Sequence, residues 1–344
     1  MTQTMMKAVG LHCYLPIDDP ESLLDLELPK PAPQGKDLLV KVLAVSVNPV
    51  DTKIRSPKPK QEEQPRVLGW DACGVVEAVG PDCELFQPGD EVYYAGAIQR
   101  QGSNSEYQLV DERIVGRKPR SLTVAEAAAL PLTAITAWEA FFDRLGLTPE
   151  AGANEGRTVL IIGAAGGVGS IAVQLARWAG LTVIGTASRP ESVAWVQQLG
   201  AHAAISHREE LAPQLQALGY THVDYIFCLN NTAGHWTSMV DVIAPQGRIC
   251  SIVDASEPLN LSLLKNKSVM FVWEFMFTRA MYETSDMIEQ HRLLNRVAEL
   301  VDSGTLRTTM TERLTPIHAD NMRLAHRKLE SGRMIGKLVL ESFE

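Results

Sequence analysis

The chain has 344 residues, of which 45% are hydrophobic and 21% charged, a composition typical of a globular protein with room for two domains. Its formal net charge of −9, without a cluster of Lys and Arg, argues against a nucleic-acid partner, because phosphate binding needs clustered cations. The first ten residues lack a secretory signal, no apolar stretch is long enough to span a bilayer, and the five cysteines follow no disulfide or zinc spacing. We therefore expect a cytoplasmic protein with reduced thiols and no membrane partner.

The first 120 residues predict a β-rich domain of the barrel-like or sandwich kind. Valine-rich or alternating segments separated by short turns predict strands at 36–48, 72–80, 90–96 and 105–112. The segment SPKPKQEEQPR at 56–66 mixes prolines with charges of both signs, and we expect an exposed loop there.

From residue 121 onward, helices and apolar strands alternate. An alanine-rich helical segment at 121–147 leads into predicted strands at 157–164, 181–188, 203–207, 223–230 and 247–253, with helices at 169–180 and 191–201. Apolar strands spaced by amphipathic helices predict an α/β fold, a doubly wound parallel sheet of the Rossmann type covered on both faces. Two further helices, at 286–304 and 318–332, and a strand at 336–341 close the chain.

The strongest motif is the turn in VLIIGAAGGVGSIAVQLARWAG. Ala164-x-Gly166-x-x-Gly169 is the dinucleotide-binding fingerprint with alanine in its first glycine position, between a clear strand and a clear helix. We expect Ala165, Gly166, Gly167, Val168 and Gly169 to bind a pyrophosphate through backbone N–H groups and the helix N-terminus. The alternative is a packing turn that binds no ligand.

The next strand predicts which cofactor binds. An acid at its end would favour NAD, but this chain has Ser188 and Arg189, with no carboxylate before Glu191. A hydroxyl and a guanidinium suit a 2′-phosphate, so we expect NADP(H). A solvent-facing loop arginine is the alternative interpretation.

Two later strands also end in polar or short segments. Asn230, Asn231, Ile252 and Val253 follow successive strands, whose carboxyl ends line the ligand crevice of such sheets, so we expect them to contact the cofactor. Strand-end turns alone also select asparagine.

Several segments together resemble the medium-chain dehydrogenase/reductase superfamily over essentially the whole chain. They are the GD-V and EY-V segments, PLTAITAW at 131–138 and GAAGGVG at 163–169. SVNPVDTKIR at 46–55 and TASRPESVAWVQQLGA at 186–201 are similar to the zinc-free quinone oxidoreductase branch, in the group of zinc-type alcohol dehydrogenase-like proteins. The resemblance implies a GroES-like substrate domain at 1–133 and 285–344 and a Rossmann NADP-binding domain at 134–284.

The same resemblance implies that the metal ligands of zinc-containing members are missing. Those members take ligands from segments that here hold Val47-Asn48, Trp70 and Leu132-Thr133, and the four-cysteine lobe is absent. These side chains cannot form the nitrogen and sulfur shell of zinc, so we expect no metal. Trp70 is expected to shape the substrate pocket, and Asp71 to make a local hydrogen bond or ion pair.

The remaining site residues are implied by the resemblance alone. Asn48 lines the catalytic cleft and the cofactor site. Thr133 and Thr136 are expected near the nicotinamide, where Thr133 contacts the substrate and Thr136 the cofactor. The alternative is that both threonines only pack within their helix. Lys53 stands where many quinone reductases have tyrosine, and is either a proton donor or a surface residue. Lys337, in GRMIGKLVL, approaches the cofactor.

The apolar segment 269–283 has two interpretations. It is either the subunit edge of a homodimer, with Trp273 or Phe275 reaching the substrate, or a buried strand of a monomer. Together these features predict a zinc-independent, NADPH-dependent oxidoreductase that transfers hydride to a quinone or enone. The alternatives are a 2-alkenal or enoyl-thioester reductase, and an NADPH-binding protein with a structural or regulatory role.

Overall fold

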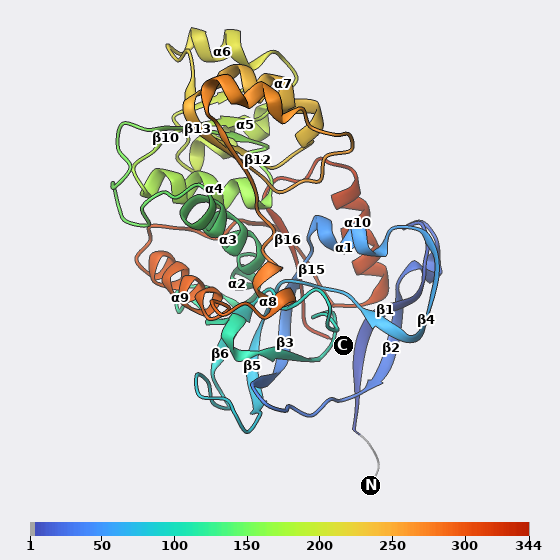
Figure 1. The fold of residues 1–344 in the computed structure, drawn as a ribbon. Helices are drawn as coiled ribbons and strands as arrows, with labels where there is room; N and C mark the ends of the chain where they lie inside the picture. Colours follow the sequence, from blue (N-terminus) through green and yellow to red (C-terminus); the bar gives the residue numbers. More distant parts are fainter. Residues whose placement is uncertain (1–3, 344) are drawn as a thin grey trace. The chain divides into compact units, whose positions relative to one another are not determined.

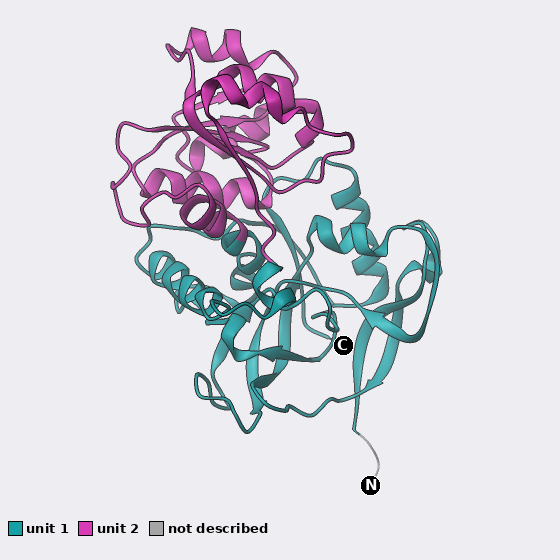
Figure 2. Cartoon of the chain, viewed as in Figure 1, with its two compact units in different colours: residues 1–135, 277–344 teal, residues 136–276 magenta. Residues whose placement is uncertain are grey.

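The computed structural model describes residues 4–343, which form two compact units (Figures 1 and 2). Unit 1 runs from the N-terminus to Ile135 and resumes at Phe277, and unit 2 comprises Thr136–Met276. The sequence analysis put these boundaries at 133/134 and 284/285. The second one lies earlier because Gln99 Nε2 donates to the Met281 carbonyl (2.8 Å), which fixes the segment after Phe277 within unit 1.

Unit 1 is built on two sheets. A three-stranded sheet has the order β2-β1-β4, and a seven-stranded sheet has the order β15-β16-β3-β5-β6-β8, with β7 paired to β3. The strands are β1 (Met5–Tyr14), β2 (Leu24–Pro29), β3 (Asp37–Ser46), β4 (Lys58–Val67), β5 (Ala72–Val79), β6 (Glu91–Tyr94), β7 (Tyr107–Asp111), β8 (Val115–Arg117), β15 (Met310–Leu314) and β16 (Lys337–Glu341). The helices are α1 (Pro49–Arg55), α2 (Val124–Ala128), α8 (Thr278–Tyr282), α9 (Glu289–Asp302) and α10 (Ala319–Glu330), with short 3₁₀ turns at Pro20–Ser22 and Glu112–Ile114.

The pairing of β16 with β3 joins the C-terminal part of unit 1 to its N-terminal part. The strands run antiparallel, with Val339 opposite Ser46 and Glu341 opposite Ala44. Most residues of β3 and nearly all of β16 are buried, so these strands form the core of the sheet. As a result, Lys337 begins its strand next to the loop that leads into α1.

The expected loop at 56–66 is wrong, because most of this segment belongs to strand β4. The strand pairs with β1 in an irregular register, and most of its side chains are exposed. Prolines and charges are tolerated on an edge strand, where they also discourage pairing with other chains. The composition that suggested a loop is therefore that of a protected sheet edge.

Unit 2 is a six-stranded, wholly parallel sheet with helices packed against it (Figure 1). Its strands are β9 (Thr158–Ile162), β10 (Thr182–Thr186), β11 (Ala203–Ile205), β12 (Val223–Cys228), β13 (Ile243–Ser251) and β14 (Met270–Trp273). Its helices are α4 (Gly167–Trp178), α5 (Pro190–Gln198), α6 (Leu211–Ala217) and α7 (Thr232–Val242), with a 3₁₀ helix at Leu261–Lys267. Helix α3 (Pro131–Trp138) contains the boundary between the units and continues as a π-helix over Glu139–Arg144.

The strand order of unit 2 confirms the predicted Rossmann fold. The order β11-β10-β9-β12-β13-β14 is the doubly wound arrangement, in which the direction of winding reverses between β9 and β12. The inner strands are buried on both faces, as the apolar runs in the sequence predicted. Ligands of such sheets bind beyond the carboxyl ends of the strands, near this reversal.

In the part of the chain that the structure describes, no helix has both the length and the apolar character that crossing a membrane would require.

Candidate active site

The turn between β9 and α4 has the geometry of a phosphate-binding loop. Gly163 has a φ of +88°, and its N–H donates to Thr186 Oγ1 at the end of β10 (2.9 Å). A Cβ on Gly169 would lie 2.5 Å from the Gly163 carbonyl oxygen, so only glycine allows α4 to pack this closely. A Cβ on Gly166 would meet only that same oxygen, at 3.6 Å, and would otherwise fill open space.

The N-terminus of α4 can therefore receive an anion. Gly166 is its N-cap, and no side chain caps the helix there. The predicted residues Ala165, Gly166, Gly167 and Val168 are all partly exposed, whereas Gly169 is buried in the helix contact. These features fit the pyrophosphate of a dinucleotide, because backbone N–H groups and the helix dipole point at an open cradle.

Ser188 and Arg189 follow β10 at the same edge of the sheet. Both are partly exposed, and Arg189 is the N-cap residue of α5. Its guanidinium forms an ion pair with Glu191 (3.2 Å), so the first acid after β10 already has a cationic partner.

The ends of β12 and β13 carry the other predicted cofactor contacts of unit 2. Asn231 has a φ of +44°, and its side chain accepts a hydrogen bond from the Gly234 N–H (3.1 Å), so it caps α7. Asn230 is exposed, and Ile252 and Val253 are partly exposed. The structure thus brings all of these residues to the carboxyl edge of one sheet, and it gives Asn231 a local structural role as well.

In unit 1 a buried polar network joins four segments that lie far apart in the sequence. The Lys337 ammonium donates to the Val47 carbonyl (2.9 Å), to Asn48 Oδ1 and to Asp71 Oδ2 (2.9 Å). Asn48 Nδ2 also donates to Asp71 Oδ2 (2.8 Å), and the Leu132 N–H donates to Asp71 Oδ1 (2.7 Å). The ion pair expected for Asp71 is present, and its partner is Lys337.

The network leaves few polar atoms of Asn48 and Lys337 for a ligand. Lys337 is 3% exposed and Asn48 is 1% exposed, and the three ammonium hydrogens have three oxygen acceptors. The structure therefore brings these two predicted residues together, with their polar atoms directed at each other and at Asp71. Their predicted roles toward cofactor and substrate stay predictions.

Asp51 also belongs to this region, and sequence analysis missed it. Its Oδ2 accepts from the Asn48 N–H (2.7 Å) at the start of α1. Burial raises the pKa of Asp51 to about 7, against the opposing effects of the Asn48 hydrogen bond and Lys337. The spacing Asn-x-x-Asp ahead of a short helix is the signal that could have identified it as a capping residue.

Burial likewise raises the pKa of Asp71, although the charge of Lys337 and hydrogen bonds from Leu132 and Asn48 act in the opposite direction. Sequence analysis gave Asp71 only a local role. In the structure, Asp71 accepts hydrogen bonds from three other members of the network, Asn48, Leu132 and Lys337.

The remaining predicted residues of unit 1 lie apart from this network or are buried in packing. Trp70 is fully buried, donates from Nε1 to the Ala97 carbonyl (3.3 Å), and packs edge-on against Phe277. Thr133 is 1% exposed and donates to the Leu130 carbonyl within its helix (3.0 Å). Lys53 is exposed on α1, outside the network.

Three predicted residues lie near the ends of unit 2. Thr136 is buried in α3, whereas Trp273 and Phe275, at and just beyond the end of β14, are 44% and 45% exposed. Between these two aromatics lies Glu274, which is buried.

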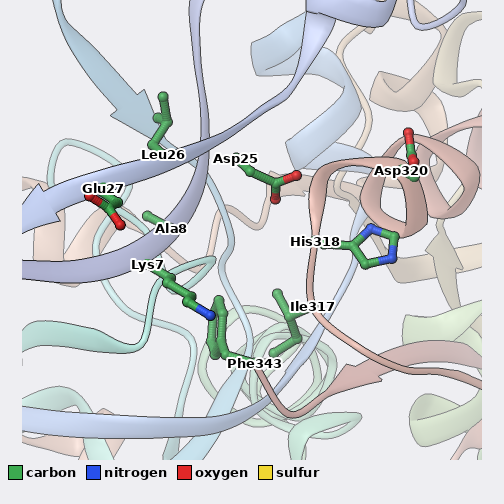
Figure 3. A pocket seen from close by; sticks show the side chains of 9 residues that line it. All are labelled: Lys7, Ala8, Asp25, Leu26, Glu27, Ile317, His318, Asp320 and Phe343. Carbon is green, nitrogen blue, oxygen red and sulfur yellow. The ribbon is translucent and has the colours of Figure 1, made fainter.

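A pocket of about 440 Å³ lies in unit 1 and contains none of the predicted site residues (Figure 3). It is lined by Lys7, Ala8, Asp25, Leu26, Glu27, Ile317, His318, Asp320 and Phe343. Two of its polar groups have structural roles at the start of α10. Asp25 Oδ1 accepts from the Ala319 N–H (2.8 Å), and His318 Nδ1 accepts from the Asn321 N–H (3.2 Å).

The donor groups of unit 1 do not fit a catalytic zinc ion. Val47, Trp70 and Leu132 have no metal-binding side-chain atom, and the Asn48 amide faces an ammonium ion. Over residues 4–343, no three His, Cys, Asp or Glu side chains are grouped so that they could hold a metal. All five cysteines are free thiols, and burial raises the pKa of Cys73, Cys228 and Cys250, which disfavours the thiolate that zinc requires.

A doubly wound sheet with a phosphate turn, joined to a β-rich unit, defines the class as a nucleotide-dependent oxidoreductase fold. Two family models match the chain: the alcohol dehydrogenase GroES-like domain over residues 34–132, and the zinc-binding dehydrogenase domain over residues 199–340.

Known proteins narrow the class further. The zinc-type alcohol dehydrogenase-like protein SAS2087 of Staphylococcus aureus is 46% identical over 97% of this chain and 99% of its own length. A crystal structure of a putative zinc-dependent alcohol dehydrogenase from Rhizobium etli is 55% identical, with a TM-score of 0.94 and complete coverage of both chains. A quinone oxidoreductase structure from Coxiella burnetii is 27% identical, with a TM-score of 0.80, over 99% of this chain and all of that one.

The chain belongs to the medium-chain dehydrogenase/reductase superfamily and is an oxidoreductase of that superfamily, whose members bind nicotinamide cofactors.

Proposed function

We propose that this protein is an NADPH-dependent reductase that transfers hydride to a quinone or enone and works without zinc. The observation that carries the proposal is the buried Lys337–Asp71–Asn48 network. It lies where the segments of Val47-Asn48, Asp71 and Leu132 meet, and a protein ammonium ion is the cation at its centre.

The network supports zinc independence for an electrostatic reason. A second cation beside the Lys337 ammonium would meet strong repulsion in a buried, low-dielectric site. The oxygens that could have attracted a metal are already hydrogen-bonded to Lys337 and Asn48. Without a Lewis acid to stabilise an alkoxide, alcohol oxidation is disfavoured, whereas quinones and enones accept hydride readily.

The preference for NADPH rests on the residues after β10. Ser188 and Arg189 offer a hydroxyl and a guanidinium where an acid would instead bind the free ribose hydroxyls of NAD. When the 2′-phosphate binds, we expect Arg189 to exchange its exposed partner Glu191 for it, since charge-assisted pairs with phosphate are the stronger ones.

The role of the chain's own residues is binding and positioning. The turn Ala165–Gly169 would hold the pyrophosphate, and Asn230, Asn231, Ile252 and Val253 would line the path of the cofactor at the sheet edge. A bound NADPH would supply the hydride, and a proton completes the reduction. Trp273 and Phe275 supply exposed apolar surface for a flat electrophile, since both are nearly half exposed at the end of β14.

A substrate panel tests the reaction. Loss of NADPH and of NADH is followed with naphthoquinone, benzoquinone, alkenals and an enoyl-CoA, with and without a chelator. We expect NADPH oxidation with a quinone or enone that the chelator does not change. Inhibition by chelator, reversed by zinc, contradicts metal independence. A preference for alkenals or the enoyl-CoA would make the protein a 2-alkenal or enoyl-thioester reductase in place of a quinone or enone reductase. Tight NADPH binding without any turnover would indicate an NADPH-binding protein that is not an enzyme.

The Arg189→Ala variant tests the cofactor preference. We expect about a tenfold or larger rise in the Kd of NADPH, with the Kd of NADH nearly unchanged. Arg157→Ala is the matched control, because Arg157 is an exposed arginine just before β9, at the amino edge of the same sheet. Equal weakening of both cofactors in Arg189→Ala would remove the 2′-phosphate role.

We also propose that the protein is a homodimer that pairs through β14. This strand is at the edge of the sheet, and Met270 (49% exposed) gives the edge an apolar surface. Light scattering at micromolar concentration should give a dimer mass that Met270→Asp reduces and that Leu218→Asp, at an exposed leucine beyond α6, leaves unchanged. A monomer mass for the unmodified chain contradicts the proposal.

A further inference from the structure

In unit 2, two buried glutamates lie beside one arginine. Glu139 is 0% exposed and Glu274 is 2% exposed. The Arg144 guanidinium lies 2.8 Å from Glu274 (Nε to Oε2) and 3.7 Å from Glu139 (Nη2 to Oε2). Apart from this ion pair, neither carboxyl oxygen of Glu274 has a hydrogen-bond partner among residues 4–343. Because one cation cannot neutralise two carboxylates in a buried site, the cluster favours a proton on one of the acids.

The surroundings of Glu274 put the proton on this residue. Burial and the charge of Glu139 raise the pKa of Glu274 to about 9, although Arg144 acts in the opposite direction. The third titratable group that faces Glu274 is the thiol of Cys250 on β13, and burial together with Glu274 raises the pKa of that thiol. At neutral pH, Glu274 is therefore an uncharged carboxylic acid, and Glu139 and Arg144 remain as an ion pair.

The backbone puts this acid at the carboxyl edge of the sheet, where the cofactor is proposed to bind. The Glu274 N–H donates to the carbonyl of Ser251 (2.9 Å), the last residue of β13. The next two residues of that segment, Ile252 and Val253, are proposed to line the path of the cofactor. Glu274 thus follows β14 at the level of a predicted cofactor contact.

Glu139 links the pair of acids to helix α3. It follows Thr136 by three positions, so the two side chains lie on the same face of the helix, one turn apart. Thr136 is the residue of α3 that the sequence predicts to contact the cofactor. At Glu139 the helix becomes a π-helix, a feature that occurs frequently at functional sites. Both acids therefore lie close in the chain to predicted cofactor contacts.

The site residues predicted in unit 1 offer no comparable proton donor. The three ammonium hydrogens of Lys337 have three oxygen acceptors, and the Thr133 hydroxyl donates to the Leu130 carbonyl. Lys53 is exposed on α1, outside the network. Since each hydride transferred to the substrate requires one proton, these residues leave the source of that proton unassigned.

We propose that the Glu139–Glu274 pair, held by Arg144, is the source of the proton that completes the reduction. This inference rests on the proposed reductase function and adds residues that the proposed function does not assign. With an enone, the hydride of NADPH forms a C–H bond at the β-carbon, and the electrons of the C=C bond move to the carbonyl oxygen. The products of this step are an enolate and NADP⁺.

Protonation of the enolate is the step in which the pair takes part. The O–H bond of Glu274 breaks, and through one water the α-carbon of the enolate gains a proton, because the carboxyl itself is buried. The resulting Glu274 carboxylate is left beside the Arg144 guanidinium. Solvent then restores the proton, since the Arg144 side chain is 28% exposed and the cluster is not sealed.

The experiment measures kcat at saturating NADPH from pH 6.5 to 10.5, with 2-cyclohexenone and with naphthoquinone. The unmodified protein is compared with Glu274→Gln, Glu139→Gln and Glu155→Gln, because glutamine resembles glutamate in size but cannot release a proton. Glu155 is the matched control, an exposed glutamate just before β9 at the amino edge of the same sheet. Circular dichroism and the Kd of NADPH verify that each variant folds and binds the cofactor.

With 2-cyclohexenone, the kcat of the unmodified protein should fall as the pH rises through about 9, because Glu274 then loses its proton. At pH 7, Glu274→Gln should lower this kcat by about 10²-fold and should remove the alkaline fall. With naphthoquinone the loss should be about threefold at most, since a hydroquinone anion is a weaker base than an enolate and water can protonate it. Glu155→Gln should match the unmodified protein.

Glu139→Gln gives a result that a merely structural role does not predict. The charge of Glu139 raises the pKa of Glu274, so its removal should move the alkaline fall in kcat to lower pH, by about one pH unit or more. The variant retains Glu274 and should retain most of the activity below the shifted fall.

Other outcomes overturn the inference in distinguishable ways. If 2-cyclohexenone is reduced and Glu274→Gln retains both kcat and the alkaline fall, the proton comes from elsewhere, while the reductase function stands. Equal losses with both substrates and an unchanged pH profile would show a structural role only. If only naphthoquinone is reduced, its smaller alkaline fall must likewise disappear in Glu274→Gln. If neither substrate is reduced, the proposed function fails, and this inference fails with it.

Discussion

Each unit contains two buried carboxyl groups beside one cation, but the surroundings of the two pairs differ. In unit 1, Asp51 and Asp71 accompany Lys337. In unit 2, Glu139 on the π-helix and Glu274 after β14 accompany Arg144, at 3.7 Å and 2.8 Å respectively. Each cluster has two acids for one base, so differences between the pKa values of the acids arise from the hydrogen-bond donors around them.

The two acids of unit 1 accept hydrogen bonds from separate donors. Asp51 accepts from the Asn48 N–H, and Asp71 accepts from the Leu132 N–H, from Asn48 Nδ2 and from Lys337. These donors favour the charged carboxylate and limit the rise in pKa that burial causes. In unit 2, by contrast, no backbone N–H of the described residues donates to Glu274, and burial together with the charge of Glu139 raises the pKa of Glu274 to about 9.

This difference shows that the number of charges alone does not decide the protonation state of a buried cluster. In unit 1, backbone N–H groups and the Lys337 ammonium oppose the effect of burial on the pKa of each acid, although burial still raises the pKa of Asp51 to about 7. Where a second carboxyl stands in place of such donors, its charge adds to the effect of burial, as it does for Glu274 beside Glu139 in unit 2. We therefore expect Glu274 to remain protonated at neutral pH and Asp71 to be paired with Lys337 as an ion.

Removing the cation of unit 1 should have the largest effect. Lys337→Met leaves Asp71 and Asp51 buried without a counter-charge, so we expect the free energy of unfolding to fall by about 3–5 kcal/mol. Denaturation by urea, monitored by circular dichroism, measures it. Lys41→Met, at an exposed lysine of β3, is the control and should change stability by no more than about 0.5 kcal/mol.

The double variant Lys337→Met with Asp71→Asn separates the ion pair from the packing of the two side chains. Each single variant leaves one charge buried, whereas the double variant leaves none from this pair. The double variant should therefore lose less stability than the sum of the singles, by at least about 1 kcal/mol. Additive losses would mean that the pair is not energetically coupled in the native state.

The cluster in unit 2 should give the next largest effect, through pH. Glu274 has a pKa raised from 4.5 to about 9, so between these values the folded state holds a proton that the unfolded state has released. Stability must therefore fall as the pH rises through this window, by at most about 1.4 kcal/mol per pH unit. From pH 7 to 9 the loss should reach about 2 kcal/mol, because the slope has fallen to half its maximum at the folded-state pKa.

Glu274→Gln tests this prediction, because glutamine retains the shape and a hydrogen-bond donor for Glu139 but cannot ionise. The slope of unfolding free energy against pH should largely disappear in this variant above pH 7. Glu257→Gln, at an exposed glutamate of the same unit, should retain the slope of the unmodified protein. Equal slopes in all three proteins would show that Glu274 ionises normally.

The comparison also shows what the sequence could and could not predict. The strand–turn–helix at Ile162–Gly169 and the residues that follow each parallel strand were predictable, because those signals are local in the sequence. The network around Lys337 was not predictable in the same way, because the hydrogen bonds of Lys337 join residues 266 to 290 positions apart in the sequence. The sequence predicts Lys337 and Asn48 as site residues, but not their contact with each other.

Burial explains the other differences. Thr133 and Trp70 were predicted from their positions in family segments, yet both are buried, with hydrogen bonds to backbone carbonyls that no sequence pattern specifies. Glu139 and Glu274 gave no signal, since a lone glutamate in a sequence is usually exposed. Their pairing depends on the path of the π-helix past the end of β14, which only the tertiary structure determines.

Asp51 should give the smallest of the three effects. Its pKa is raised from 3.8 only to about 7. Asp51 therefore contributes to the pH dependence of stability up to about pH 8, and above that pH only Glu274 does. Between pH 6 and 7, the unmodified protein should lose stability more steeply than Asp51→Asn, with a difference of about 1 kcal/mol at most. Above pH 8 the two proteins should show the same slope of unfolding free energy against pH, because Asp51 is then ionised in both the folded and unfolded states.

Asp82→Asn, at an exposed aspartate, controls for the change of net charge. If Asp51→Asn instead alters the slope only above pH 8, the assignment of the lower pH range to Asp51 in unit 1 and of the higher one to Glu274 in unit 2 is wrong.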